Sequence, residues 1–225
     1  MFETLKNALT PNDIEWFKAD FEKLINVDPV DRPYDSEKSQ EMYGITATVI
    51  DRRHILSNKE KGFQKMRNIM SRYMPPNLVF YMAYQRQLVP HQMHTDKGSA
   101  GPMEAYRKSA IIPLSENING IFKTIVWNRQ FPSNQDFQEY IQAFIANKSQ
   151  FPIISNVSQM YDVDHCWADS PSITDTMTLA GVYDYELGSI ALFDQVNVHC
   201  SSNWLKYKVV DHKDIILLHI WPKES

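Results

Sequence analysis

The sequence predicts one α+β domain, residues 1–225, whose strands form an antiparallel sandwich or barrel. Helical patterns come first and short strand-like runs follow, without the regular alternation that builds parallel sheets. The chain has 225 residues and is 43% hydrophobic, which is enough for one sizeable core. Only 7 glycines are present and no glycine-rich phosphate loop is found, so a nucleotide-binding fold is not expected.

Two helices are expected before the strands. Thr10 can cap the first helix and Pro11 fits its first position. Its buried face is predicted from apolar residues at helical spacing: Ile14, Phe17, Phe21 and Leu24. Residues 28–42 are polar and contain proline, which predicts a loop, and the β-branched run 43–50 predicts a strand. The capping-box pattern of residues 57–60 starts a second helix that ends before Pro75.

Six short apolar runs, separated by polar or proline-containing turns, are predicted as the later strands: 78–84, 110–114, 121–127, 177–185, 189–193 and 215–221. Residues 128–176 interrupt this series with a predicted helix over 134–148 and a loop rich in aromatic and acidic residues. Long insertions are often functional, so we predict a lid that selects the substrate. The residues that would face a substrate are Trp127, Tyr161, Asp162, Asp164, His165 and Trp167. The alternative is a surface insertion whose helix packs on the barrel.

Composition argues against several classes of protein. The net charge of −4 and the lack of a basic run disfavour nucleic acid as a partner. The N-terminal residues contain no long apolar stretch, so neither a signal peptide nor a membrane span is expected. Cys166 and Cys200 are the only cysteines, which disfavours a disulfide framework and favours a reducing, cytoplasmic compartment.

The motif that indicates chemistry is His94-Thr95-Asp96, followed much later by Phe193-Asp194 and His199. Two imidazoles and one carboxylate can occupy one face of an Fe(II) ion and leave positions open for a cosubstrate and O₂. The spacing of His94 and Asp96 places both side chains on one face of a strand. We therefore predict that these two residues and His199 bind one metal ion.

Several other polar residues have competing interpretations. His212 and Asp214 repeat the same spacing, but a polar turn before the final strand explains them. His91 is a candidate fourth ligand or an exposed loop histidine. Asp162, Asp164 and His165 form either a second metal site or a solvated acidic loop. Cys200 has no recognisable base beside it and is not expected to be a nucleophile.

Taken together, these segments resemble the Fe(II)/2-oxoglutarate-dependent oxygenases, and within them the aspartyl/asparaginyl β-hydroxylase and bacterial proline hydroxylase branch. The similarity covers residues 78–127 and 178–222. The matching positions are Pro90, His94, Asp96, Pro113, Leu114, Phe193, Asp194, His199, Asn203 and Lys213. The resemblance implies a double-stranded β-helix, that is, a jelly-roll or cupin-like core, with Fe(II) at its mouth.

The resemblance also implies a 2-oxoglutarate site. The family's basic residue on the last strand is usually Arg, whereas this chain offers Lys206, Lys208 and Lys213. Lys213 fits the start of the strand best and is preferred as the anchor, while Lys208 fits the spacing best. Further residues expected to bind the cosubstrate are Tyr84, Arg107 and Asn203, although Arg107 lies slightly early and Tyr84 could equally be a core residue.

The predicted function is hydroxylation of a C–H bond in an amino acid, a peptidyl side chain or a related small molecule. The cofactors expected are Fe(II) and 2-oxoglutarate. Two alternatives belong to other classes. One is a non-catalytic β-barrel binding module, and the other is a cupin-like metalloenzyme that does not use 2-oxoglutarate.

Overall fold

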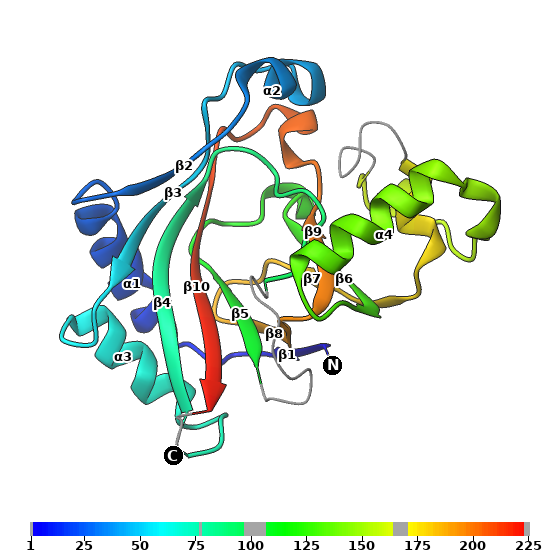
Figure 1. The fold of residues 1–225 in the computed structure, drawn as a ribbon. Coiled ribbons are helices and arrows are strands. Elements are labelled where there is room, and N and C mark those ends of the chain that lie inside the picture. Colours follow the sequence, from blue (N-terminus) through cyan, green and yellow to red (C-terminus); the bar gives the residue numbers. More distant parts are fainter. Residues whose placement is uncertain (1, 77, 97–106, 164–170, 223–225) are drawn as a thin grey trace.

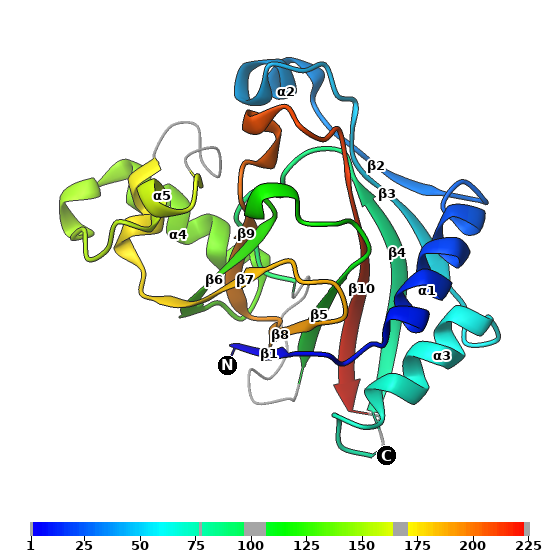
Figure 2. The ribbon, with the colours of Figure 1, turned by 180° about the vertical axis from the view of Figure 1, so that it is seen from behind.

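The protein is built from two antiparallel sheets that face each other, with helices on their outer sides (Figures 1 and 2). The computed structural model describes residues 2–76, 78–96, 107–163 and 171–222. Helices α1 and α3 cover the outer side of the larger sheet, and α4 packs against the smaller one. The helices are α1 (Pro11–Leu24), α2 (Ser36–Tyr43), α3 (Lys61–Met70), α4 (Asn134–Ala146) and α5 (Val157–Met160).

The larger sheet has seven strands and the smaller has three. In spatial order the larger sheet contains β1 (Phe2–Leu5), β8 (Ile190–Asp194), β5 (Lys108–Pro113), β10 (Lys213–Pro222), β4 (Leu78–Gln87), β3 (Val49–Leu56) and β2 (Val30–Pro33). The smaller sheet contains β7 (Leu179–Asp184), β6 (Lys123–Gln130) and β9 (Asn197–Ser201).

The chain passes repeatedly between the two sheets. After β4 and β5 in the larger sheet it forms β6 and β7 in the smaller one, then β8, β9 and β10 fall in the larger, smaller and larger sheets respectively. This alternation closes the sheets around a common interior and gives a jelly-roll arrangement. It also brings strands that are distant in sequence to the same mouth.

Helix α1 forms as the sequence predicts. The Thr10 hydroxyl accepts a hydrogen bond from the Asp13 amide at 3.2 Å, and the Asp13 carboxylate accepts one from the Thr10 amide at 3.0 Å. This reciprocal pair satisfies amides that a helix start would otherwise leave unpaired. Phe17 and Phe21 are fully covered and join the core between the helices and the larger sheet.

The two faces of the larger sheet have different roles. On β4, Met82 and Tyr84 point to the outer core under α1 and α3, whereas Gln85 and Gln87 line an interior cavity. Side chains alternate between faces along a strand, so parity assigns each residue to core or cavity. On β10, the inward residues are the odd-numbered ones, beginning with Lys213.

Residues 28–50 differ from the sequence prediction. The predicted loop contains β2 and α2, and the strand predicted over 43–50 starts at Val49 instead. The Asp35 side chain caps α2 by accepting hydrogen bonds from the amides of Glu37 and Lys38, and Gly44 ends the helix with a φ of 69°. These local hydrogen bonds outweigh the β-branched character of the run after Gly44.

The other boundaries lie near their predicted positions, with two strands missed. Helix α3 begins at Lys61, and the Glu60 carboxylate accepts a hydrogen bond from the Ser57 amide. Strands β1 and β9 were not predicted, and β9 carries His199. Polar residues at both ends of β9 concealed its short apolar core. No helix in the described part of the chain is long and apolar enough to cross a membrane.

Candidate metal centre and cavity

Two histidines meet through a backbone bridge at the mouth of the jelly roll. The segment after β4 runs antiparallel to β9 at one point, where the His94 amide donates to the His199 carbonyl at 3.0 Å. The His199 amide donates back to the His94 carbonyl, also at 3.0 Å. The Asp96 amide donates to the Gln195 carbonyl, which holds the carboxylate beside the two rings.

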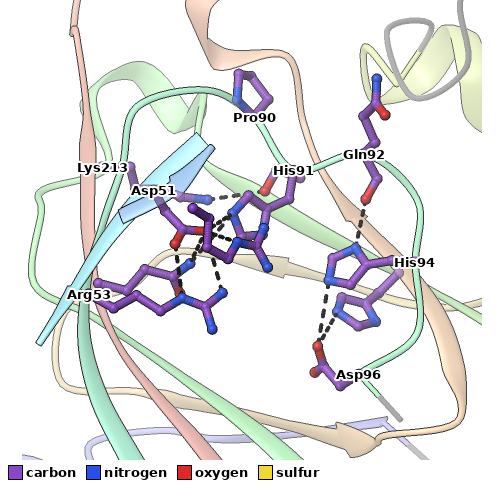
Figure 3. A network of polar contacts seen from close by, with 12 residues as sticks. Asp51, Arg53, Pro90, His91, Gln92, His94, Asp96 and Lys213 are labelled. Atoms are coloured by element: carbon purple, nitrogen blue, oxygen red, sulfur yellow. Dashed lines mark hydrogen bonds and ion pairs between the residues drawn. The ribbon is translucent and has the colours of Figure 1, made fainter. Parts of the chain in front are cut away.

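Backbone carbonyls set the orientation of both imidazoles, and Figure 3 shows the contact between Gln92 and His94. His94 Nδ1 lies 2.7 Å from the Gln92 carbonyl, and His199 Nδ1 lies 3.1 Å from the Asn197 carbonyl. Each Nδ1 therefore carries the proton, which leaves the Nε2 lone pair available. The two Nε2 atoms lie 3.5 and 3.6 Å from Asp96 Oδ1.

The electrostatics of this cluster favour an ionised Asp96. Burial would raise the pKa of its carboxyl, but the nearby His199 lowers it well below the ordinary value. Burial and the charge of His199 lower the pKa of His94. Burial also works against protonated His199, yet the Asp96 carboxylate raises its pKa overall. The Ser109 hydroxyl donates to Asp96 on the side away from the histidines and lies 3.2 Å from His219 Nδ1.

The three side chains have the chemistry of a metal site. One ligand atom from each lies within 4.8 Å of the other two, and no other such cluster occurs among the residues that the structure describes. Two imidazole nitrogens and one carboxylate oxygen suit a divalent transition metal with open coordination positions. Because both rings already have their outer nitrogens hydrogen-bonded, little rearrangement is needed to bind an ion.

The cluster opens into a cavity of about 420 Å³ between the two sheets. Both sheets contribute to its walls, as do the residues that lead to His94. The polar side chains on the wall, apart from the three candidate ligands, include Arg32, Arg53, Gln85, Gln87, His91, Thr124, Tyr185, Ser201 and His219. No described residue of 128–176 lines the cavity, and Asp164, His165 and Trp167 of the predicted lid lie outside the described residues.

Lys213 is the notable cation of this region. Its side chain is fully buried, and its Nζ donates to the Tyr185 hydroxyl at 3.1 Å and the Ser201 hydroxyl at 3.3 Å. Both of these partners line the cavity. Within the described ranges, no carboxylate pairs with this ammonium. Burial lowers the pKa of Lys213 to about 7, because an uncompensated charge is costly away from water.

The other two lysines proposed as anchors lie elsewhere. Lys208 is exposed on the surface, where it follows a short 3₁₀ turn with a φ of 55°. Lys206 is half exposed and forms an ion pair with Asp162 at 2.5 Å. Asp162 also accepts a hydrogen bond from Tyr207, so this acidic residue belongs to a surface network.

Three residues predicted to bind the cosubstrate do not reach the cavity. Tyr84 points to the opposite face of β4, where its hydroxyl donates to Asp20 at 2.7 Å. Arg107 precedes β5 and Asn203 follows β9, and neither side chain is on the cavity wall. Strand parity explains the error at Tyr84, since it has the parity of the core residues.

His91 is not an exposed loop histidine. Its ring is mostly buried, and Nε2 lies 2.9 Å from Asp51 Oδ2. The same carboxylate also accepts hydrogen bonds from Gln85 and Arg53. Burial lowers the pKa of His91 to about 3, so the ring is neutral near pH 7. Figure 3 shows this Asp51 network on one side of the view and His94 with Asp96 on the other.

The sequence analysis missed this network. Its members Asp51 and Arg53 lie on β3, which the prediction had placed too early in the chain. The signal available was the pair of glutamines, Gln85 and Gln87, at alternate positions of an otherwise apolar strand. Polar residues at such spacing on a central strand indicate a polar interior face.

The second His-x-Asp pair behaves as a polar turn. His212 is partly exposed, and Asp214 forms a two-pronged ion pair with Arg86 of β4, at 2.9 Å for each contact. This pairing removes Asp214 as a candidate metal ligand.

Comparisons with known proteins reveal similarity of fold. No family model and no curated protein matches the sequence. The non-haem α-ketoglutarate-dependent epimerase SnoN from nogalamycin biosynthesis is 9% identical, with a TM-score of 0.59 over 98% of this chain and 78% of SnoN. HygX from Streptomyces hygroscopicus, solved with nickel and 2-oxoglutarate bound, is 13% identical, with a TM-score of 0.55 over 98% of this chain and 82% of HygX.

A prolyl-4-hydroxylase from Pseudomonas putida is also similar. It is 8% identical, with a TM-score of 0.51, and the match covers 100% of this chain and 93% of the hydroxylase. At such low identity the likeness concerns the fold alone. The three structures are thus an α-ketoglutarate-dependent epimerase, a protein with bound nickel and 2-oxoglutarate, and a prolyl-4-hydroxylase.

Proposed function

We propose that this protein is an Fe(II)- and 2-oxoglutarate-dependent dioxygenase that hydroxylates a C–H bond of a small molecule. The observation that carries the proposal is the pairing of two features at one cavity. His94, Asp96 and His199 offer a two-histidine, one-carboxylate set, and Lys213 supplies a buried cation behind the same wall. The fold likeness to SnoN, HygX and the prolyl-4-hydroxylase supports it.

The three ligands would hold the iron on one side. The Gln92 and Asn197 carbonyls keep both Nε2 atoms aimed at the ion, and Ser109 orients the Asp96 carboxylate. When bound, iron would activate O₂, the oxidant, and 2-oxoglutarate would supply two electrons through its oxidative decarboxylation to succinate. The protein contributes the orientation of the ligands and of the bound groups.

Lys213 would anchor the distal carboxylate of 2-oxoglutarate. Its ammonium lacks an anionic partner among the described residues, and its two hydroxyl contacts lie on the cavity wall. A lysine acts there as a point charge rather than as a bidentate fork. A dicarboxylate with one end at the metal and the other at Lys213 would satisfy both charged groups.

The finer assignments are part of the same proposal. The strand alternation fits a double-stranded β-helix, with β4 to β10 and the bridged segment at His94 as its strands. The motif resemblance favours the aspartyl/asparaginyl β-hydroxylase and bacterial proline hydroxylase branch, whose substrates are amino acids and peptidyl side chains. An iron(II) enzyme in which the described cysteine, Cys200, is unpaired also suits a reducing, cytoplasmic compartment.

The decisive experiment is conversion of 2-oxoglutarate to succinate. Iron-loaded protein prepared without O₂ should bind 2-oxoglutarate, and admission of O₂ should then release succinate. Metal binding without affinity for 2-oxoglutarate would indicate a cupin-like metalloenzyme instead. Binding of neither would indicate a non-catalytic binding module.

A further inference from the structure

The cavity has a second polar wall, formed by three neighbouring strands of the larger sheet. Arg32 on β2 lies opposite Asp51 on β3, and Asp51 lies opposite Gln87 on β4. Arg53 is two residues after Asp51 and therefore shares its face. Arg32, Arg53 and Gln87 all line the cavity that holds the candidate metal centre.

This wall carries one excess positive charge. Asp51 is fully buried, with Arg53 Nε at 2.9 Å from one carboxylate oxygen and Arg32 Nε at 3.0 Å from the other. The third side chain that forms an ion-pair contact with Asp51 among the described residues is His91, whose Nε2 lies 2.9 Å from Oδ2. Two guanidinium groups thus share a single carboxylate beside the cavity.

Two groups on the wall have unused hydrogen-bonding capacity. Arg32 Nε is buried and, although it lies 3.0 Å from Asp51 Oδ2, it does not meet hydrogen-bond geometry with it, while the Arg32 side chain as a whole is 41% exposed. Gln87 is 4% exposed, and its Oε1 likewise has no partner among the described residues. Native proteins rarely leave buried polar atoms unpaired, so such atoms on a cavity wall indicate ligand contacts.

We propose that Arg32 and Arg53 bind a carboxylate of the substrate, while Gln87 pairs with a neutral polar group beside it. This inference rests on the proposed function. In the proposed complex, the positive charges of Fe(II) and Lys213 balance the negative charges of Asp96 and 2-oxoglutarate. The excess positive charge of Arg32 and Arg53 over Asp51 is therefore available to a substrate with one negative charge. A guanidinium fork matches a carboxylate in geometry. A phosphate monoester near pH 7 carries close to two charges and would exceed the balance.

The inference narrows the substrate class. An uncharged side chain inside a peptide offers no anion, whereas an N-acylated amino acid or a peptide C-terminus offers a carboxylate next to an amide. Gln87 is suited to that amide. The cavity of about 420 Å³ is in the lower part of the range for small-molecule sites. We therefore assign the substrate as a small monoanionic acid with a neutral amide.

The test compares matched acids and amides. Under anaerobic conditions, which prevent turnover, protein loaded with Fe(II) and 2-oxoglutarate is titrated calorimetrically with N-acetyl derivatives of the 20 common L-amino acids. The primary amides of the same compounds serve as neutral partners wherever the side chain is uncharged, and only these acid–amide pairs are compared. We expect at least one acid to bind no less than tenfold more tightly than its amide. Arg32→Gln should weaken that acid by at least tenfold and leave its amide within twofold.

Arg52→Gln is the matched control. Arg52 is the next residue to Arg53 but faces away, where it pairs with Asp31 and Asn26. Its replacement should change neither affinity. Arg32→Lys should recover part of the affinity for the acid, since it keeps the charge and loses the fork. Circular dichroism melting of each variant separates local effects from unfolding.

Three results would overturn the inference. In the first, no acid binds more tightly than its amide. In the second, the acid and its amide each bind to the Arg32→Gln protein as tightly as to the wild type. In the third, only phosphate esters bind. In each case 2-oxoglutarate binding and succinate release test the proposed function separately. If those two activities persist, the enzyme class stands and only the substrate assignment falls. If 2-oxoglutarate does not bind to the wild type, the proposed function itself is wrong.

Discussion

At the scale of single residues, the backbone decides which nitrogen of each histidine faces the cavity. Carbonyls two residues earlier in the chain bond both Nδ1 atoms, so the two Nε2 atoms converge on Asp96. This hydrogen bond between a ring and the backbone needs only a local extended conformation and no additional side chain. It explains how a short motif can be oriented without a dedicated partner for each ring.

Replacing His94 by Ala should abolish tight iron binding. Removal of one of three protein ligands should lower Fe(II) affinity on the order of 100-fold or more, beyond the effect of losing an outer partner. Anaerobic calorimetric titration with Fe(II) measures this directly. His212→Ala is the control, because His212 belongs to the other His-x-Asp pair and is only partly buried. Equal losses in the two variants would contradict the assignment.

Lys213→Met should separate stability from cosubstrate binding. Replacing a buried, unpaired charge with an apolar side chain of similar volume is expected to raise the free energy of unfolding by about 1–3 kcal/mol. The same change should weaken 2-oxoglutarate by at least about tenfold, or roughly 1.4 kcal/mol. Urea unfolding and anaerobic titration measure the two effects. Lys208→Met should alter neither, and a large effect there would transfer the anchor to Lys208.

The sequence contains enough information to single out the three candidate metal ligands but not the walls of the cavity. The spacing of His94 and Asp96 predicts a shared face, and the structure brings His199 beside them. Arg32 and Arg53 could not be placed, because their positions depend on β2 and on the register between β3 and β4. Register between distant strands depends on tertiary contacts that local patterns do not encode.

At the scale of elements, alternation along β4 divides core from cavity. Tyr84 and Gln85 are neighbours in sequence, yet one bonds Asp20 of α1 and the other bonds Asp51 inside the jelly roll. The apolar run was sufficient to predict the strand. Its two faces are both partly polar, so the sequence alone did not show which face was interior.

Tyr84→Phe should therefore affect stability and leave cosubstrate binding intact. Loss of the hydrogen bond to Asp20 is expected to cost about 1 kcal/mol of unfolding free energy. Urea denaturation monitored by circular dichroism measures the cost, and titration with 2-oxoglutarate supplies the comparison. A tenfold loss of 2-oxoglutarate affinity without destabilisation would restore Tyr84 as a cosubstrate residue.

Helix α4 forms a core with the outer face of the smaller sheet. Phe137 and Phe144 are fully covered there and pack in one cluster with Trp127 of β6. This supports the view that α4 packs on the barrel. The lid function of residues 128–176 stays a prediction, since residues 164–170 lie outside the described ranges.

Phe144→Ala should destabilise the whole protein, because α4 and the smaller sheet share this core. A buried phenylalanine reduced to alanine typically costs about 3–5 kcal/mol. The neighbouring Ile145 is 38% exposed, so Ile145→Ala should cost less than about 1 kcal/mol. Urea unfolding followed by tryptophan fluorescence compares them. A second, separate transition in the Phe144 variant would mean that the insertion unfolds independently.

At the scale of the whole molecule, the proposed role of Lys213 predicts that 2-oxoglutarate affinity depends on pH. The free protein holds this group with a pKa of about 7, and the unfolded chain holds it near 10.5. Between these values the unfolded state binds more protons, so this residue's contribution makes stability rise with pH. Cosubstrate binding needs the protonated amine, so its affinity should fall in the same window. The groups that face Lys213 are Tyr185, Ser201 and Cys200.

The expected result is a dissociation constant for 2-oxoglutarate that rises by up to about tenfold per pH unit between pH 7 and 9. Calorimetric titration at saturating metal, repeated in buffers of different ionisation enthalpy, measures both the constant and the proton uptake. Lys213→Met should remove the pH dependence. A constant affinity across this range would mean that Lys213 stays charged in the free protein or does not contact the cosubstrate.

The position of β10 has a consequence for synthesis of the chain. Residues 213–222 form a central strand of the larger sheet, between β5 and β4, and no direct pairing joins those two strands. A nascent chain on the ribosome therefore has an open seam through its sheet until these residues emerge. Two unpaired strand edges are exposed in the meantime, which makes the interval prone to aggregation. Demand for chaperones should accordingly peak at the very end of translation of this region.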